Sequence, residues 1–201
     1  TQYEYDDLNR ITRKIPDLWF RDRGDAIVAF GYAANGQRAT MVDSSGSTTF
    51  SYDSRDRLTG KATPQGTLGY TYDEAGNLTG MQSPNSGATY TYDALNRCAS
   101  ATGSSGATTY SYDNVGNLLG VALPNGVATN YNYNTAYRLT DMGSATAGTT
   151  LASYTYTLTL GGVRTAVSEL SGRHVGYSYD GLWRLTGETI TNDPHGVNGS
   201  I

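Results

Sequence analysis

The stretch from Tyr70 to Thr79 reads Tyr-Thr-Tyr-Asp-Glu-Ala-Gly-Asn-Leu-Thr, and variants of it recur along the whole chain. Second tyrosines at positions 52, 72, 92 and 112 are 20 residues apart each time. Nine copies align, with the second aromatic position at residues 5, 32, 52, 72, 92, 112, 133, 158 and 179. At position 158 the residue is leucine, and this register is chosen because it brings Gly162 to the turn. Because a fixed period is typical of repeat arrays, residues 1–201 are interpreted as one domain made of tandem repeats.

Each copy has the residue pattern of two short strands joined by a turn. In a strand, residues i and i+2 share a face, so both aromatics of Tyr-x-Tyr point one way. The aspartate then leaves the strand, and its carboxylate can accept backbone N–H bonds across the turn. Arg-Leu-Thr or Asn-Leu-Thr begins the return strand, and a second turn leads to the next copy. The sequence therefore predicts an all-β fold of antiparallel strand pairs, whose natural twist makes the sheet coil or spiral.

The fourth residue after the second aromatic marks the predicted turn. Seven copies carry residues that tolerate the left-handed conformation there, namely Asn9, Gly36, Asp56, Gly76, Asn96, Gly116 and Gly162. Tyr137 and Trp183 break this column, so we expect those two turns to differ. Structural repeat roles are predicted for Tyr5, Asp6, Tyr52, Asp53, Tyr72, Asp73, Gly76, Tyr92, Asp93, Tyr112, Asp113, Gly116, Tyr133, Tyr179 and Asp180.

Residues 15–29 form the largest departure from the period. This insertion contains Trp19 and Phe20 beside several charged residues. It is interpreted as a long connection whose aromatics pack onto the sheet, and a protruding contact loop is the alternative.

Composition restricts the class of protein. Seventeen tyrosines and 25 glycines suit half-buried strands and tight turns, and the formal net charge is −4. A weakly acidic chain disfavours nucleic acid or an anionic membrane as the main partner. No run of 18 apolar residues occurs, so the sequence predicts no membrane span. A single cysteine, Cys98, excludes an intrachain disulfide and is interpreted as a small half-buried side chain.

The sequence contains no convincing catalytic, cofactor or metal site. His174 and His195 are the only histidines and lie in different predicted turn regions. The repeated aspartates recur at equivalent places, which favours turn capping over a catalytic carboxylate pair. Neither a Gly-x-Ser-x-Gly element nor a phosphate-binding loop is present. We therefore predict a protein that is not an enzyme and that has no catalytic, cofactor-binding or metal-binding residues.

Three stretches resemble the YD repeat of the RHS (rearrangement hot spot) family most clearly. They are Tyr70 to Thr79, Tyr110 to Leu119 and Tyr177 to Thr186, and the resemblance extends over essentially residues 1–201. The resemblance implies a β-strand spiral that closes into a hollow shell. In bacterial polymorphic toxins and insecticidal toxin complexes such a shell encloses a C-terminal toxin, and in teneurins a similar shell serves adhesion.

By this resemblance the chain is expected to be an interior shell segment of a large, secreted or cell-surface bacterial protein. Its partners would be flanking RHS repeats and an enclosed C-terminal cargo, with no cofactor. The alternative is an adhesive or filament-forming protein that binds glycans or its own copies through aromatic stripes and strand edges. The stretch Asp193-Pro-His-Gly196 is similar to a DPxG element of the family's self-cleaving region, but we interpret it as a turn.

Overall fold

The computed structural model describes residues 1–16 and 27–200, and the described residues form strands and turns without any helix. The all-β prediction is therefore confirmed. All nineteen strands belong to one antiparallel sheet in which strands adjacent in the chain are hydrogen-bonded. The insertion at residues 15–29, with Trp19 and Phe20, lies largely outside the described residues.

The chain divides into two compact units, residues 1–97 with 102–104 and residues 98–101 with 105–201. The prediction of a single domain over 1–201 therefore stays a prediction. The first unit contains β1 (Gln2–Tyr5), β2 (Ile11–Ile15), β3 (Val28–Tyr32), β4 (Arg38–Asp43), β5 (Gly46–Tyr52), β6 (Leu58–Thr63), β7 (Gly66–Tyr72), β8 (Leu78–Gln82) and β9 (Gly87–Tyr92). The residues of β10 (Cys98–Gly103) are divided between the two units.

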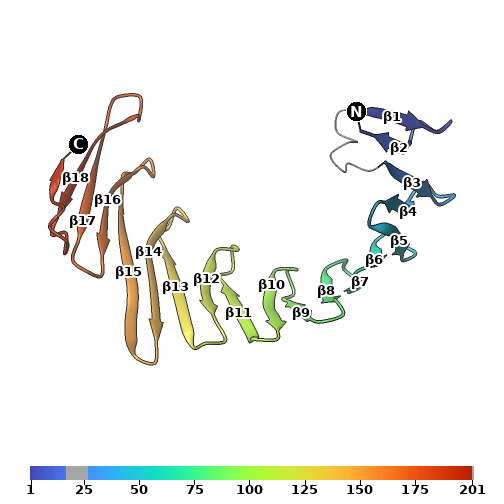
Figure 1. Cartoon of the computed structure of the whole chain (residues 1–201). Helices are drawn as coiled ribbons and strands as arrows, with labels where there is room; N and C mark the ends of the chain where they lie inside the picture. Colours follow the sequence, from blue (N-terminus) through green and yellow to red (C-terminus); the bar gives the residue numbers. More distant parts are fainter. Residues whose placement is uncertain (17–26, 201) are drawn as a thin grey trace. The chain divides into compact units, whose positions relative to one another are not determined.

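The second unit continues the same alternation of strands and turns. It contains β11 (Gly106–Tyr112), β12 (Leu118–Ala122), β13 (Val127–Tyr133), β14 (Leu139–Thr146), β15 (Thr149–Leu158), β16 (Arg164–Glu169), β17 (His174–Tyr179), β18 (Leu185–Thr191) and β19 (Gly199–Ser200). Within each unit, consecutive strands lie side by side in chain order (Figure 1).

Eight hairpins that follow the second aromatic position have the same register. In the hairpin of β7 and β8, Thr71 pairs with Gly80 and Tyr72 pairs with Leu78, which leaves Thr79 as an extra residue. The same shift at the second aromatic position occurs in the hairpins that end at residues 5, 32, 52, 112, 133, 158 and 179. A β-bulge thus bends each return strand at the same point and sharpens its local twist.

The two faces of the strands differ in chemistry, as the alternation in the sequence predicts. Tyr70 and Tyr72 are half-buried, whereas Thr71 between them is exposed. The same pattern holds in β9, β11, β13 and β17. The aromatic side chains therefore share one face, and serine, threonine or asparagine occupies the other.

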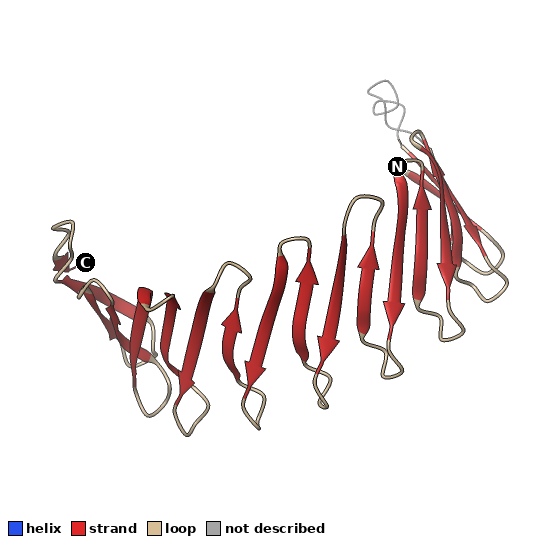
Figure 2. Cartoon of the chain, turned by 90° about the horizontal axis from the view of Figure 1, so that it is seen from below, coloured by secondary structure: helices blue, strands red, loops and turns tan. Residues whose placement is uncertain are grey.

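Few side chains are fully enclosed, because neither unit has a second layer among its described residues (Figure 2). Only Ala166, Val167, Val175 and Thr48 are buried in the described part of the chain. No large described side chain is completely buried. Stability must therefore come from contacts between neighbouring strands rather than from a central core.

Candidate functional site: the Tyr-Asp turns

The turn that follows each Tyr-x-Tyr strand, here called the Tyr-Asp turn, is organised by its first side chain. In the third repeat, Asp53 Oδ1 accepts the N–H groups of Arg55 at 2.8 Å and of Arg57 at 3.0 Å. The other carboxylate oxygen, Oδ2, accepts Nε–H of Arg57 at 2.7 Å. One carboxylate thus satisfies two turn amides and fixes the first side chain of the return strand.

The same arrangement recurs at all six predicted aspartates. Oδ2 accepts an arginine Nε–H at Asp6, Asp53, Asp93 and Asp180, and an asparagine Nδ2–H at Asp73 and Asp113. Asn134 makes only the hydrogen bonds to the backbone of its turn, since its Oδ1 accepts the N–H groups of Ala136 and Arg138 at 3.0 Å each. An amide can therefore replace the carboxylate in the turn without loss of the backbone hydrogen bonds.

These hydrogen bonds lower the pKa values of the turn aspartates. At Asp93 the N–H of Arg97 lowers the pKa most, partial burial opposes it, and the Arg97 guanidinium lowers it further. At Asp73 the amide of Asn77 lowers the pKa most. The pKa values of Asp6, Asp53, Asp113 and Asp180 are also lowered. These carboxylates are therefore stabilised in the charged form, which suits a hydrogen-bond acceptor and not a general acid at neutral pH.

All nine turns place their fourth residue, here called the left-handed residue, at positive φ. The values run from 59° at Asn9, Asn96 and Tyr137 to 103° at Gly116. The expectation that the turns at Tyr137 and Trp183 differ is wrong, because these residues have φ of 59° and 61°. Their turns also keep the backbone hydrogen bonds, Tyr137 N–H to Asn134 O at 2.9 Å and Trp183 N–H to Asp180 O at 3.0 Å. Closure by the first side chain and the strand register override the poor left-handed propensity of a bulky residue.

Where the second aromatic position holds tyrosine, its hydroxyl connects the repeat to the one before it, and only the eighth repeat, with Leu158, lacks this bond. Tyr72 Oη–H donates to the carbonyl of Leu58 at 2.9 Å, and Tyr92 donates to that of Leu78 at 2.8 Å. Equivalent bonds start from Tyr32, Tyr52, Tyr112, Tyr133 and Tyr179. Sequence reasoning missed this bond, although a signal was present. Phenylalanine occurs at the first aromatic position, as Phe30 and Phe50, but never at the second, where the hydroxyl is used.

The residue after the left-handed one, here called the exit residue, also reaches the next repeat when it is arginine. The guanidinium carbon of Arg57 lies 4.6 Å from the ring centre of Tyr72, and its Nη1 donates to the carbonyl of Asp73 at 3.0 Å. Arg10 lies over the ring of Tyr32 at 4.6 Å in the same way. One arginine therefore binds the aspartate of its own turn and the backbone or ring of the next.

The remaining candidate residues do not gather into a site. His174 Nδ1 lies 3.0 Å from Ser168 Oγ on an exposed part of the sheet, and Cys98 is a half-buried free thiol. The stretch from Asp193 to Gly196 is a turn in which Asp193 Oδ1 accepts the N–H of His195 at 2.8 Å. Across the described residues, no three metal-ligating side chains come together. The part of the chain that the structure describes has no helix long and apolar enough to cross a membrane.

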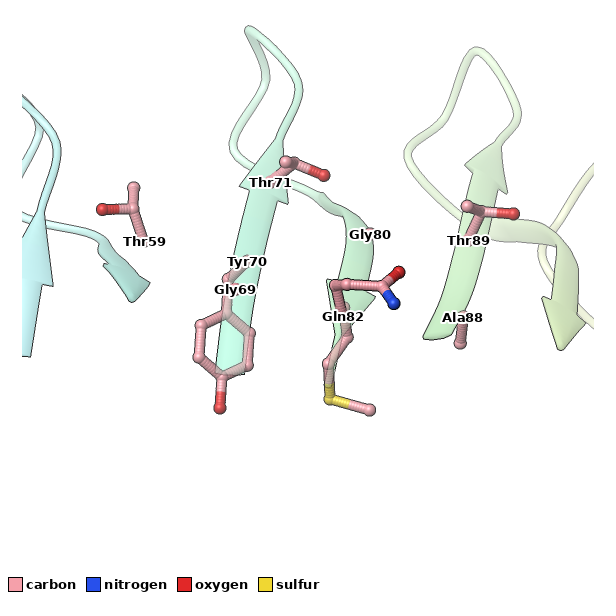
Figure 3. A pocket seen from close by; sticks show the side chains of 9 residues that line it. Thr59, Gly69, Tyr70, Thr71, Gly80, Gln82, Ala88 and Thr89 are labelled. Carbon is pink, nitrogen blue, oxygen red and sulfur yellow. The ribbon is translucent and has the colours of Figure 1, made fainter. Parts of the chain in front are cut away.

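The polar face carries a shallow hollow of about 340 Å³ (Figure 3). Its floor includes Gly80, which pairs with Thr71 on one side and Thr89 on the other. A Cβ at Gly80 would lie 2.7 Å from Thr71 Oγ1, so glycine allows the threonine hydroxyl to fold over the strand. The hollow is lined by hydroxyl, amide and methyl groups, and apart from Tyr70, whose ring belongs to the opposite face, no lining residue has an ionisable side chain.

Comparison with known proteins agrees with this repeat geometry. The RHS Repeat family model matches residues 32–68, 72–108 and 92–126, and each stretch covers two successive Tyr-Asp turns. No match is found among curated protein sequences.

Two solved structures resemble the fold. A crystal structure described as TcdB2-TccC3-TEV is 16% identical with a TM-score of 0.73, and the match covers 93% of this chain and 12% of that one. A Photorhabdus luminescens Tc holotoxin pore carrying a TccC3 mutation is 12% identical with a TM-score of 0.56, covering 93% of this chain and 15% of that one. This chain thus spans 12% and 15% of the length of those proteins. The motif, the turn geometry and the family match agree that residues 32–68 and 72–126 of this chain consist of RHS repeats.

Proposed function

We propose that this chain is a non-catalytic length of wall in a larger, secreted RHS-repeat protein that encloses or displays a C-terminal cargo. The observation that carries the proposal is the hydroxyl bond from the second tyrosine to the preceding repeat, which recurs at seven junctions between Tyr32 and Tyr179. Side-chain bonds that run from repeat to repeat, and do not converge on one place, suit a scaffold.

The Tyr-Asp turns and the two faces are used for building in this proposal. Asp6, Asp53, Asp73, Asp93, Asp113 and Asp180 close turns, and Tyr52, Tyr72, Tyr92, Tyr112, Tyr133 and Tyr179 tie repeats together. Gly76 and Gly116 supply left-handed turn residues, and Tyr5 and Asp6 form the corresponding pair of the first repeat. Flanking RHS repeats are the partners that such a wall requires.

The test uses the full-length protein that contains this chain together with its natural C-terminal region. A protease recognition sequence is placed in the turn at Ser104 and Ser105 in one variant, and within the C-terminal region in another. A wall that encloses a cargo predicts rapid cleavage at the exposed turn and slow cleavage in the C-terminal region, until urea unfolds the repeats. Equal cleavage rates at the two places in the folded protein would contradict enclosure. They would agree with a wall of folded repeats that only displays its cargo.

Adhesion is a second candidate, favoured by exposed aromatics at the Tyr-Asp turns. Tyr137 is 60% exposed and Trp183 is 58% exposed, each at the tip of its turn. Exposed aromatic rings can stack on sugars or on another protein. Binding of the isolated chain to a glycan array, abolished by Trp183→Ala and unaffected by Leu95→Ala, would favour adhesion. Sedimentation of the chain as a monomer with no glycan binding would contradict it.

A further inference from the structure

The nine Tyr-Asp turns are of two kinds, and these kinds alternate strictly along the chain. In five turns the left-handed residue has a side chain and the exit residue is arginine: Asn9-Arg10, Asp56-Arg57, Asn96-Arg97, Tyr137-Arg138 and Trp183-Arg184. In the four turns between them the left-handed residue is glycine and the exit residue is not arginine: Gly36-Gln37, Gly76-Asn77, Gly116-Asn117 and Gly162-Val163. In sequence, therefore, each arginine up to Arg138 precedes a glycine in the next turn.

At the junction of the seventh and eighth repeats, the arginine exit residue occupies the space that the following glycine leaves. A Cβ at Gly162 would lie 2.5 Å from Nε and 2.6 Å from Cζ of Arg138, closer than real Cβ contacts come. At Gly36 and Gly76 the added Cβ would lie 3.9 Å from Nη1 of the preceding arginine, an ordinary contact, and at Gly116 it would have no atom within 4 Å. Positive φ favours glycine at all four positions, and at Gly162 the neighbouring arginine also leaves no room for a Cβ.

The shorter exit residues leave room that the next turn fills. Asn77 Nδ2–H donates to Oδ1 of Asn96, the left-handed residue of the following turn, at 2.8 Å. Asn117 precedes Tyr137 and Val163 precedes Trp183, so both bulky left-handed residues follow a short exit residue.

We propose that the exit residue of one repeat and the left-handed residue of the next form a matched pair, which determines which repeats can lie side by side. Arginine fits beside glycine, and a short side chain fits beside a residue with a side chain. The physical unit of the array is then two repeats, and the array tolerates gain or loss of repeats in pairs better than singly. This inference concerns the order of repeats and holds whether or not the protein encloses a cargo.

A double-mutant cycle at the junction of the seventh and eighth repeats tests the pair. Gly162→Asn keeps a residue that tolerates positive φ but places its Cβ against Arg138. The matched control is Gly172→Asn, because Gly172 has φ of 86° and no atom within 4 Å of an added Cβ. Overpacking predicts an unfolding equilibrium constant roughly ten-fold to a hundred-fold larger for Gly162→Asn than for the control in urea titrations. Adding Arg138→Asn should remove most of that excess.

Equal effects of the two glycine substitutions, or an additive effect of Arg138→Asn, would overturn the pairing. Coupling between contacting residues is what distinguishes a matched pair from two independent structural positions. The mirrored cycle uses the opposite kind of turn. Asn77→Arg should destabilise the chain because its guanidinium meets Asn96, and Asn96→Gly should restore stability to the double variant.

Two deletions of equal length test the pairing without any point substitution. Deleting residues 53–72 brings the exit residue Gln37 next to the left-handed residue Gly76, which leaves the junction with spare room. Deleting residues 73–92 brings the exit residue Arg57 next to the left-handed residue Asn96, which crowds the junction. Both remove 20 residues and one complete repeat from the first unit. We expect the second deletion variant to unfold at a lower urea concentration, and Asn96→Gly within it to raise the midpoint to that of the first. Identical midpoints, or no recovery with Asn96→Gly, would refute the proposal.

Discussion

The turns at the two ends of the strands are built differently, and each row of turns is here called an edge of the sheet. At one edge, nine Tyr-Asp turns share one length, one left-handed position and one set of backbone hydrogen bonds. At the other edge the turns differ in length and type. Asp43 pairs with Gly46 around a two-residue turn, whereas Leu123 N–H bonds to Val127 O around a longer one. Variation in chain length is therefore confined to this second edge.

The comparison shows where order in the array is imposed. At the Tyr-Asp edge a tyrosine hydroxyl joins neighbouring repeats at seven of the eight junctions, and an arginine also reaches the next repeat, as Arg57 does. At the opposite edge, Arg173 Nε–H donates to Asp193 Oδ2 of the following turn at 2.9 Å. Elsewhere on that edge a turn glycine packs against the proline of the following turn. A Cβ at Gly46 would lie 2.6 Å from Pro64, and one at Gly66 would lie 2.5 Å from Pro84. This packing is apolar and recurs less often, so it constrains the register less.

The largest effect that would sharpen this comparison is expected from Tyr92→Ala in the fifth repeat. Its half-buried ring and its bond to the Leu78 carbonyl would both be lost. Truncating a partly buried aromatic is expected to lower the free energy of unfolding by about 2 to 3 kcal/mol. Tyr5→Ala is the matched control, because Tyr5 lies in the first repeat and is 54% exposed. Urea titration of both variants should show the smaller loss for Tyr5→Ala, and equal losses would contradict stabilisation by stacked repeats.

The opposite edge gives a matching expectation of tolerance. Inserting two glycines between Ser104 and Ser105 lengthens a turn in which no contact to another repeat depends on either serine's side chain. Loop-length entropy predicts a loss of about 0.5 to 1 kcal/mol. The same insertion between Asp93 and Ala94 separates the carboxylate from the amides it accepts, so a larger loss is expected. Comparable urea midpoints for the two insertions would show that the edges are equivalent.

Much of the architecture could be predicted because the same residue types recur at fixed spacings in every repeat. The period of 20 around Tyr52 and Tyr72, the period of two in Tyr-x-Tyr and the turn aspartates were enough for the strands and their order. The turns at Tyr137 and Trp183 were predicted wrongly because local propensity was given more weight than closure by Asn134 and Asp180. The contacts between repeats were missed because they join residues about 14 or 20 apart, which strand periodicity alone does not bring together.

A smaller effect should isolate the hydroxyl at the Tyr-Asp edge. Tyr92→Phe removes the donor to Leu78 O at 2.8 Å and keeps the ring. A carbonyl left without that donor is expected to lower the free energy of unfolding by about 1 kcal/mol. The control is Tyr90→Phe, since the equivalent positions of two other repeats already hold Phe30 and Phe50. If the two phenylalanine variants unfold at the same urea concentration, the hydroxyl bond contributes nothing to the joining of repeats.

The smallest effect concerns the charge of the turn aspartates. The pKa of Asp93 is lowered in the folded chain, first by the N–H of Arg97, so its contribution to stability is present above the unfolded pKa. That contribution is lost as the pH falls through the folded pKa, and Asp53 and Asp73 behave in the same way. The chain should therefore lose urea resistance progressively below about pH 4.

Asp93→Asn tests this assignment, because Asn134 shows that an amide can accept the same two turn amides. At pH 7 the variant should unfold slightly more easily than the parent, since its Oδ1 keeps the backbone bonds and only the charged contact to Arg97 is lost. Below pH 4 the gap between variant and parent should close, because the parent's carboxylate is then protonated as well. A gap that stays constant from pH 7 to pH 3 would mean that the charge of Asp93 does not stabilise its turn, and that the Tyr-Asp edge is held by its backbone geometry and tyrosine hydroxyls alone.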